Sequence, residues 1–96
     1  MSNSQSAPNE LDHRIRKLIY RANHRGIKEM DIILGRFAKA NLSSFDAREL
    51  DQFEEILQEN DRDLLPWFIG EVDYPSEKPR EMFERIMSSL DQGAAL

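Results

Sequence analysis

The residues with the richest chemistry in this chain lie in one short run, Arg21-Ala22-Asn23-His24-Arg25-Gly26-Ile27-Lys28-Glu29-Met30-Asp31. Basic side chains cluster before the glycine, and two carboxylates follow it. A plain turn between two helices requires a glycine and little else. Charged groups of both signs at one junction therefore favour a binding surface that makes charge-assisted hydrogen bonds. The alternative is helix capping, because cations at the end of one helix and carboxylates at the start of the next stabilise both helices.

Side chains suited to catalysis are few in the sequence. The two histidines, His13 and His24, are eleven residues apart in one predicted helix, which separates them by about three turns. That spacing is unsuited to a metal pair or a general-base arrangement. There is no cysteine, which excludes a thiolate ligand or nucleophile. The sequence therefore predicts no catalytic residue and no metal site.

The helix that precedes the junction carries a basic stripe. At 100° per residue, its cations lie side by side next to the apolar face, with His24 at their edge. They are Arg14, Lys17, Arg21 and Arg25. We expect this stripe to flank a binding centre and to steer a partner toward it.

Helical periodicity dominates the sequence and predicts an all-α fold, a compact single domain of five helices with short connections over residues 11–90. The helices are expected over about 11–24 and 27–40, from Ser43 or Ser44 to about 58, after the cap Asn60-Asp61, and from Pro79 onward. Residues 1–10 are expected to be a disordered tail and residues 91–96 a flexible one.

Apolar residues at helical spacing define the predicted core. They are Leu11, Ile15, Leu18, Ile19, Ala22, Met30, Ile33, Leu34, Phe37, Leu50, Phe53, Ile56, Leu57, Leu64, Leu65, Phe68, Ile69, Met82, Phe83, Ile86, Met87 and Leu90. Trp67 belongs with them, because its neighbours Leu64 and Phe68 favour packing over contact with a ligand.

Composition and charge limit the classes of function. The chain has 96 residues, about 40 % apolar, and a net charge of −5. Residues 11–40 carry eight Lys and Arg against three Asp and Glu, whereas residues 41–96 carry five against fourteen. The acidic remainder disfavours nucleic acid, and no apolar run is long enough to span a membrane. A small helical regulatory module, antitoxin-like and binding another protein or nucleic acid, remains the alternative.

Arg25-Gly26-Ile27-Lys28-Glu29 resembles the R-G-x-x-E signature of the flavinylation factors of succinate dehydrogenase, the family of FAD assembly factor SdhE and succinate dehydrogenase assembly factor 2. The similarity extends over about residues 11–90. It includes the apolar Ile32-Ile33-Leu34 after the motif and the downstream run of Asp61-x-Asp63-Leu64 into Trp67.

The resemblance implies an assembly chaperone that is not itself an enzyme. It would bind the flavoprotein subunit of succinate dehydrogenase, and in some bacteria that of fumarate reductase, and promote covalent attachment of FAD to a histidine of that subunit. The expected client-binding residues are Arg14, Lys17, Arg21, Arg25, Gly26, Lys28, Glu29 and Asp31. The resemblance also implies a cytoplasmic bacterial monomer. The sequence has no glycine-rich dinucleotide fingerprint, so we expect that the chain does not itself bind FAD tightly.

Overall fold

The computed structural model describes the backbone of residues 3–93 and the side chains of residues 10–90. Within this part of the chain the structure is all helical, which confirms the predicted fold class. Its elements are α1 (Asn3–Asn23), α2 (Lys28–Asn41), the short 3-10 helix η1 (Leu42–Ser44), α3 (Ala47–Leu57), α4 (Asp61–Phe68) and α5 (Arg80–Gly93).

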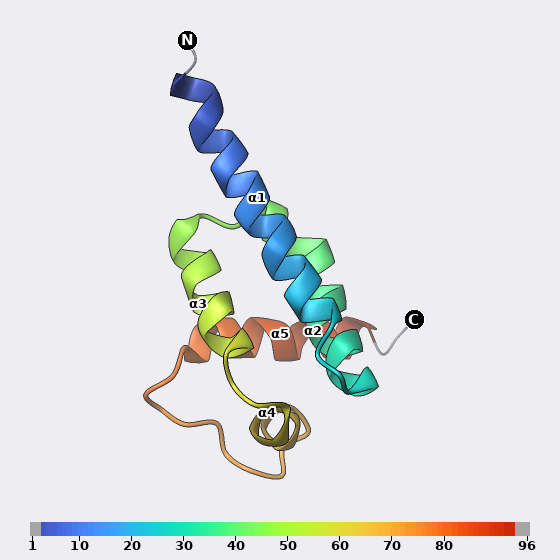
Figure 1. Cartoon of the computed structure of the whole chain (residues 1–96). Helices are drawn as coiled ribbons and strands as arrows, with labels where there is room; N and C mark the ends of the chain where they lie inside the picture. Colours follow the sequence, from blue (N-terminus) through green and yellow to red (C-terminus); the bar gives the residue numbers. More distant parts are fainter. Residues whose placement is uncertain (1–2, 94–96) are drawn as a thin grey trace.

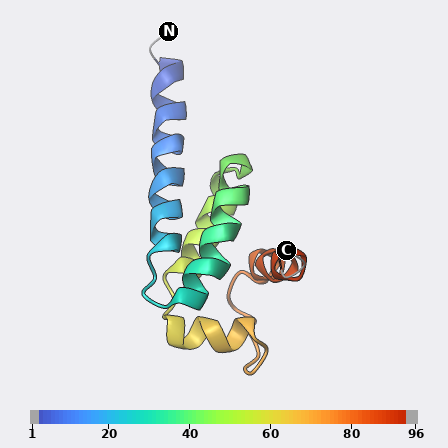
Figure 2. The ribbon, with the colours of Figure 1, turned by 90° about the vertical axis from the view of Figure 1, so that its right-hand side faces the viewer.

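The helices pack around one hydrophobic core. α1 and α2 form an antiparallel pair, and α5 crosses behind α2 and α3 (Figure 1). The view turned by 90° shows α4 lying across the lower end of this pair, below the junction that joins α1 to α2 (Figure 2). The largest fully buried side chains come from several helices, and Phe53, Leu18, Met30 and Leu64 are among them. The junction thus lies at the end of the α1–α2 pair, next to α4 (Figure 2).

α1 is longer than the sequence predicts. It begins at Asn3, so residues 3–10 are helical where a disordered tail was expected. Adding turns to a helix that already exists avoids the cost of nucleation, which explains how a polar segment can continue it. The first turns extend beyond the other helices (Figure 1), and Leu11, expected in the core, is 40 % exposed. At the other end α5 runs to Gly93, and the rest of the expected C-terminal tail lies outside the described residues.

The start of α3 corrects a second prediction. Ser43 and Ser44 lie in η1, and the N-cap is Asp46. The Asp46 carboxylate accepts from the Glu49 backbone N–H at 2.8 Å, and the Glu49 carboxylate accepts from the Asp46 N–H at 2.9 Å. This reciprocal capping box satisfies two amide groups that a helix start otherwise leaves unpaired.

The segment between α4 and α5 is fixed by Tyr74. Its ring stacks on Phe83 with 4.0 Å between centroids and meets Trp67 edge to face at 5.2 Å. Tyr74 is buried, and Trp67 packs against the core as predicted, whereas Ile69 is 57 % exposed and lies outside the core. Burial, with the nearby carboxylates of Glu55 and Glu59, raises the pKa of Tyr74 to about 12.

Candidate functional site

The junction between α1 and α2 is a tight loop with a defined shape. α1 ends at Asn23, and Gly26 then adopts a φ of +99°, a conformation that L side chains rarely adopt. The Arg25 backbone N–H donates to the Asp31 carboxylate at 2.6 Å, so the first turn of α2 reaches back to fix the loop. Asp31 therefore acts within the chain, as a partner of the loop backbone.

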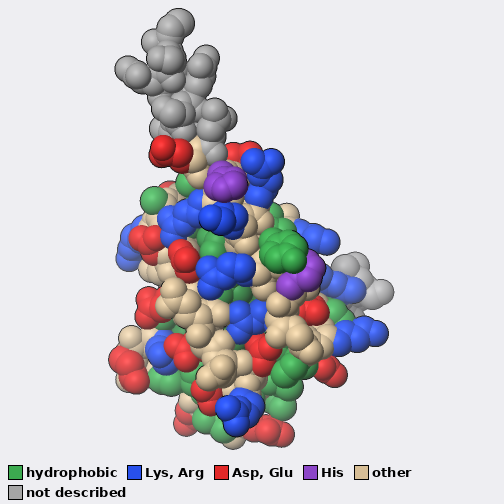
Figure 3. All heavy atoms as spheres, in the orientation of Figure 1, with side chains coloured by type: hydrophobic (Ala, Val, Ile, Leu, Met, Phe, Trp, Pro, Cys, Tyr) green, Lys and Arg blue, Asp and Glu red, His purple; other side chains and the backbone are tan. Residues whose placement is uncertain are grey.

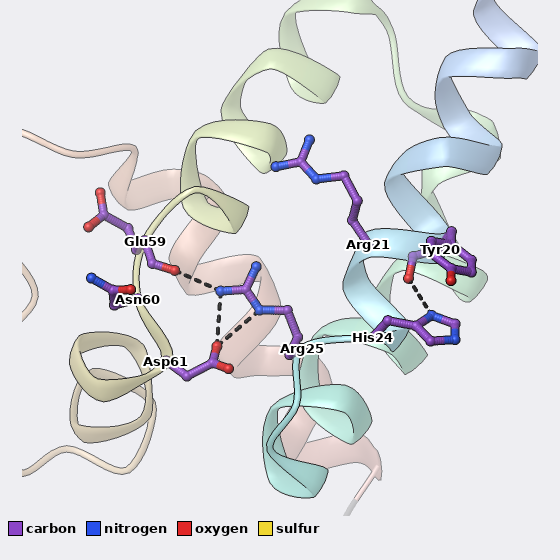
Figure 4. A pocket seen from close by; sticks show the side chains of 7 residues that line it. All are labelled: Tyr20, Arg21, His24, Arg25, Glu59, Asn60 and Asp61. Atoms are coloured by element: carbon purple, nitrogen blue, oxygen red, sulfur yellow. Dashed lines mark hydrogen bonds and ion pairs between the residues drawn. The ribbon is translucent and has the colours of Figure 1, made fainter.

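The Arg25 side chain points into the protein. Its Nε donates to Asp61 Oδ1 at 3.0 Å, and its Nη2 lies 2.9 Å from the same oxygen (Figure 4). Nη1 donates to the Leu57 carbonyl, and Nη2 donates to the Glu59 carbonyl at 2.7 Å. Arg25 with these three partners is here called the Arg25 latch.

The Arg25 latch ties the junction to the end of α3 and the first residue of α4. The side chains of Arg25 and Asp61 are only 11 % and 12 % exposed, so their charges are largely removed from water and depend on each other. A guanidinium is suited to this position, because its planar fork of donors can serve a carboxylate and two carbonyls together. The latch explains the fixed position of the loop relative to α4.

The sequence analysis expected Arg25 on a basic stripe that contacts a partner, and Asp61 only as a cap. The structure differs because α1 ends before Arg25, so the stripe does not continue to it. The signal that could have revealed the contact is the joint presence of Arg25-Gly26 and the downstream Asp61-x-Asp63-Leu64 run. Local periodicity carries no information on a contact across 36 residues.

The exposed residues of the predicted site lie on the outer side of the loop. Gly26, Lys28 and Glu29 face solvent together at the start of α2. A Cβ built on Gly26 would have no atom within 4 Å, so the glycine opens toward free space. The backbone of Gly26 is therefore open to a partner, and the cation of Lys28 and the carboxylate of Glu29 lie close to it in the sequence.

The remaining cations of the site lie further along α1 and do not join this cluster. Lys17 is exposed, whereas Arg14 pairs with Asp51 at 2.7 Å and with Glu54 at 2.9 Å. Arg21 pairs with Glu54 at 3.2 Å. The hydrogen bond to Asp51, followed by that to Glu54, raises the pKa of Arg14. The acidic face of α3 is therefore in part an ion-pair partner of α1.

A pocket of about 330 Å³ opens beside the latch, between α1 and the α3–α4 connection (Figure 4). Its lining residues are Tyr20, Arg21, His24, Arg25, Glu59, Asn60 and Asp61. The rings of Tyr20 and His24 stack at its α1 side, with 3.9 Å between centroids. Lys and Arg side chains gather over α1 on the face shown in Figure 3.

Two further features bear on function. Among the described residues, no three His, Cys, Asp or Glu side chains are grouped so as to hold a metal ion. No helix of the described part of the chain has the length and apolar character needed to cross a bilayer.

A small helical domain with an exposed glycine loop, fixed from inside by a largely buried ion pair, is a scaffold suited to binding another protein. Comparison with known sequences defines it further. Residues 16–90 match the family model described as "Flavinator of succinate dehydrogenase", and the chain belongs to this family.

Curated relatives agree with this assignment. The chain is 41 % identical over 86 residues to the FAD assembly factor SdhE of Acetobacter pasteurianus, covering 90 % of this chain and 79 % of the relative. It is 32 % identical over 90 residues to the mitochondrial succinate dehydrogenase assembly factor 2 of Debaryomyces hansenii, covering 94 % of this chain and 63 % of that protein. It thus spans less than two thirds of the length of the yeast relative. No solved structure matches the chain.

Proposed function

We propose that this chain binds the flavoprotein subunit of succinate dehydrogenase, its client, and promotes covalent attachment of FAD to that subunit. The observation that carries the proposal is family membership combined with the position of the signature. The Arg-Gly-x-x-Glu residues form a fixed loop and the first turn of α2, with Gly26 and Glu29 facing solvent. Such a loop can be presented to a partner without an entropic cost of ordering it.

Each signature residue has a distinct role in this proposal. Gly26 lets the client backbone approach closely, because no side chain projects from the loop there. Glu29 and Lys28 make charge-assisted contacts at the edge of the approach. Arg25 is a positioning residue that acts through the loop. Lys17, together with Arg14 and Arg21 on the same helix, steers docking. Asp31 supports the loop by accepting a hydrogen bond from its backbone.

The chemistry belongs to the client in this proposal. Holding a reactive pair in the right geometry accelerates its reaction by orders of magnitude, without a proton-transfer group from the helper. FAD remains with the client, which accords with the absence of a glycine-rich dinucleotide fingerprint in the sequence. We propose a non-catalytic maturation factor that acts as a monomer in the bacterial cytoplasm. The bacterial relative supports that location.

The test is the covalent flavin fluorescence of the client band on a denaturing gel, in cells with and without this chain. We expect the fluorescent band to be lost without the chain while the client protein persists. An unchanged band would contradict the proposal. The same gel, probed for the fumarate reductase flavoprotein, tests whether that subunit is a second client.

A further inference from the structure

The pocket beside the Arg25 latch has features that the proposed function does not use. Tyr20 is 64 % exposed, although its ring forms an ordered stack with His24. An exposed tyrosine held in one orientation offers a large contact area with little conformational entropy left to lose. Tyrosines of this kind dominate the binding energy of many protein interfaces.

The polar groups of the pocket include both donors and acceptors. In the described part of the chain, Arg21 uses only Nη1, on Glu54, and the Asn60 side chain makes no hydrogen bond. His24 Nδ1 lies 2.8 Å from the Tyr20 carbonyl, so this nitrogen donates and Nε2 is left free as an acceptor in the neutral ring. Tyr20 and His24 lie on one side of Arg25 and Asn60 lies on the other (Figure 4), so the lining as a whole offers both donors and acceptors.

This chemistry discriminates between possible occupants. The charged groups of the lining already have ion-pair partners: Arg25 pairs with Asp61, Arg21 with Glu54, and Glu59 with Lys78. A simple anion therefore gains little charge attraction there. A peptide presents N–H and C=O groups in alternation, which matches the mixed lining. About 330 Å³ lies at the low end for ligand pockets, room for one side chain with its peptide groups and too small to enclose a dinucleotide.

We propose that this pocket receives an extended peptide segment of the flavoprotein client, with an apolar or planar side chain packed on the Tyr20–His24 stack. The inference rests on the proposed function, and it adds an anchor to the client interface. The anchor is continuous with the signature, because His24 directly precedes Arg25 and Gly26. Arg25 and Asp61 of the Arg25 latch line the pocket, so the latch connects the pocket to the signature loop.

The test measures the Kd of the purified flavoprotein subunit for labelled full-length chains. We expect Tyr20→Ala to weaken binding about tenfold, as truncation of an aromatic anchor does. Tyr20→Phe keeps the stacked ring and should bind within about twofold of wild type. His24→Ala and Asn60→Ala should each weaken binding. His13→Ala is the matched control, an exposed histidine of α1 far from the pocket, and should bind as wild type.

Two results would overturn the inference. One is that Tyr20→Ala and Asn60→Ala, shown to be folded by circular dichroism, bind the client as tightly as wild type. The other is saturable binding of free FAD to the wild-type chain that Tyr20→Ala abolishes, which would make the flavin the occupant. Failure of the wild-type chain to bind the client at all would refute the proposed function as well, so the two failures are distinguishable.

Discussion

Arg25 makes more contacts between distant parts of the chain than any other side chain of the signature. Its guanidinium connects two carbonyls and one carboxylate that lie 32 to 36 residues away in the sequence. Breaking a largely buried ion pair leaves the surviving partner without compensation, which costs far more than losing a surface pair. The signature arginine is therefore a determinant of structure as well as of any client contact.

Substitution of either partner of the latch should destabilise the domain. We expect Arg25→Ala to lower the free energy of unfolding by about 3 kcal/mol. Asp61→Ala should lower it by less, because only the loss of the arginine also leaves two backbone carbonyls without a donor. The double variant should lose about 0.5–3 kcal/mol less than the sum of the single losses. Urea denaturation of all four chains measures this coupling. Arg16→Ala, which removes an exposed pair with Asp12, is the control and should change stability by less than about 1 kcal/mol. Additive losses would contradict the latch.

The burial of Tyr74 predicts how the stability of the domain depends on pH. Its folded pKa is raised to about 12 from 10.0, so the unfolded chain ionises first as the pH rises. The stabilisation due to the buried neutral phenol is complete below about pH 10 and is lost between about pH 10 and 12. Ultraviolet absorbance should show a late tyrosinate step that Tyr74→Phe removes and Tyr20→Phe retains. If Tyr20→Phe instead removed the late step, the step would belong to Tyr20, and the assignment to a buried Tyr74 would be contradicted.

Individual residues were the hardest level to predict from the sequence. The positive φ of Gly26 follows from a glycine placed just past a helix end. The inward direction of Arg25 and the burial of Tyr74 depend on contacts between segments far apart in the chain, which periodicity does not encode. The role of Gly35 in the contact between α1 and α2 could not be predicted for the same reason.

At the scale of helices, Gly35 sets how closely α1 and α2 approach. A Cβ built there would lie 2.3 Å from the Asn23 side-chain oxygen. That amide cannot move freely, because its nitrogen donates to the Ile19 carbonyl at 2.8 Å. The glycine thus makes room for a side chain of the neighbouring helix.

Gly35→Ala should lower the free energy of unfolding by about 1–3 kcal/mol, because the added methyl overpacks the contact. The same substitution in an Asn23→Ala background has the space it needs. There it should be neutral or stabilising by up to about 1 kcal/mol, since alanine favours helix over glycine. Thermal or urea unfolding of the four chains provides the comparison. An equal loss in both backgrounds would show that Asn23 is not the obstacle.

Most helices were predictable because the apolar spacing that defines them is local. The errors lie at helix ends, where a few hydrogen bonds determine which residue begins or ends the helix. Asp46 and Glu49 form the D-x-x-E pattern of a capping box in the sequence. Ser43 and Ser44, which are also common N-cap residues, precede them and led to the wrong predicted start of α3. The early start of α1 has no apolar periodicity to reveal it.

At the scale of the whole molecule, the charge asymmetry is partly neutralised within the fold. Arg14 and Arg21 of the basic segment pair with Asp51 and Glu54 of the acidic one. Among the cations of the predicted site, Lys17 and Lys28 remain exposed, and α2 carries the further exposed cations Arg36 and Lys39. Steering by the predicted site therefore depends on Lys17 and Lys28 more than on the paired Arg14 and Arg21.

Lys17→Ala should slow association with the flavoprotein client and leave the dissociation rate unchanged, because an exposed charge at the rim of an interface acts mainly on encounter. Stopped-flow association at rising salt measures this. The wild-type rate should fall with salt more steeply than that of the variant. Lys39→Ala, an exposed lysine at the far end of α2, is the control. An effect of Lys17→Ala confined to dissociation would contradict steering.

The most direct test of the account compares two substitutions of Gly26 in covalent flavin attachment to the purified client. Gly26→Ala and Gly26→Arg impose a similar backbone strain of about 1–2 kcal/mol at positive φ, and the Cβ that each adds has no atom of the chain within 4 Å. Both should remain folded, but only arginine blocks close approach of the client. The account predicts that Gly26→Ala retains most of the wild-type rate of attachment, whereas Gly26→Arg abolishes the acceleration. Equal rates for the two folded variants would contradict a client seated on this loop.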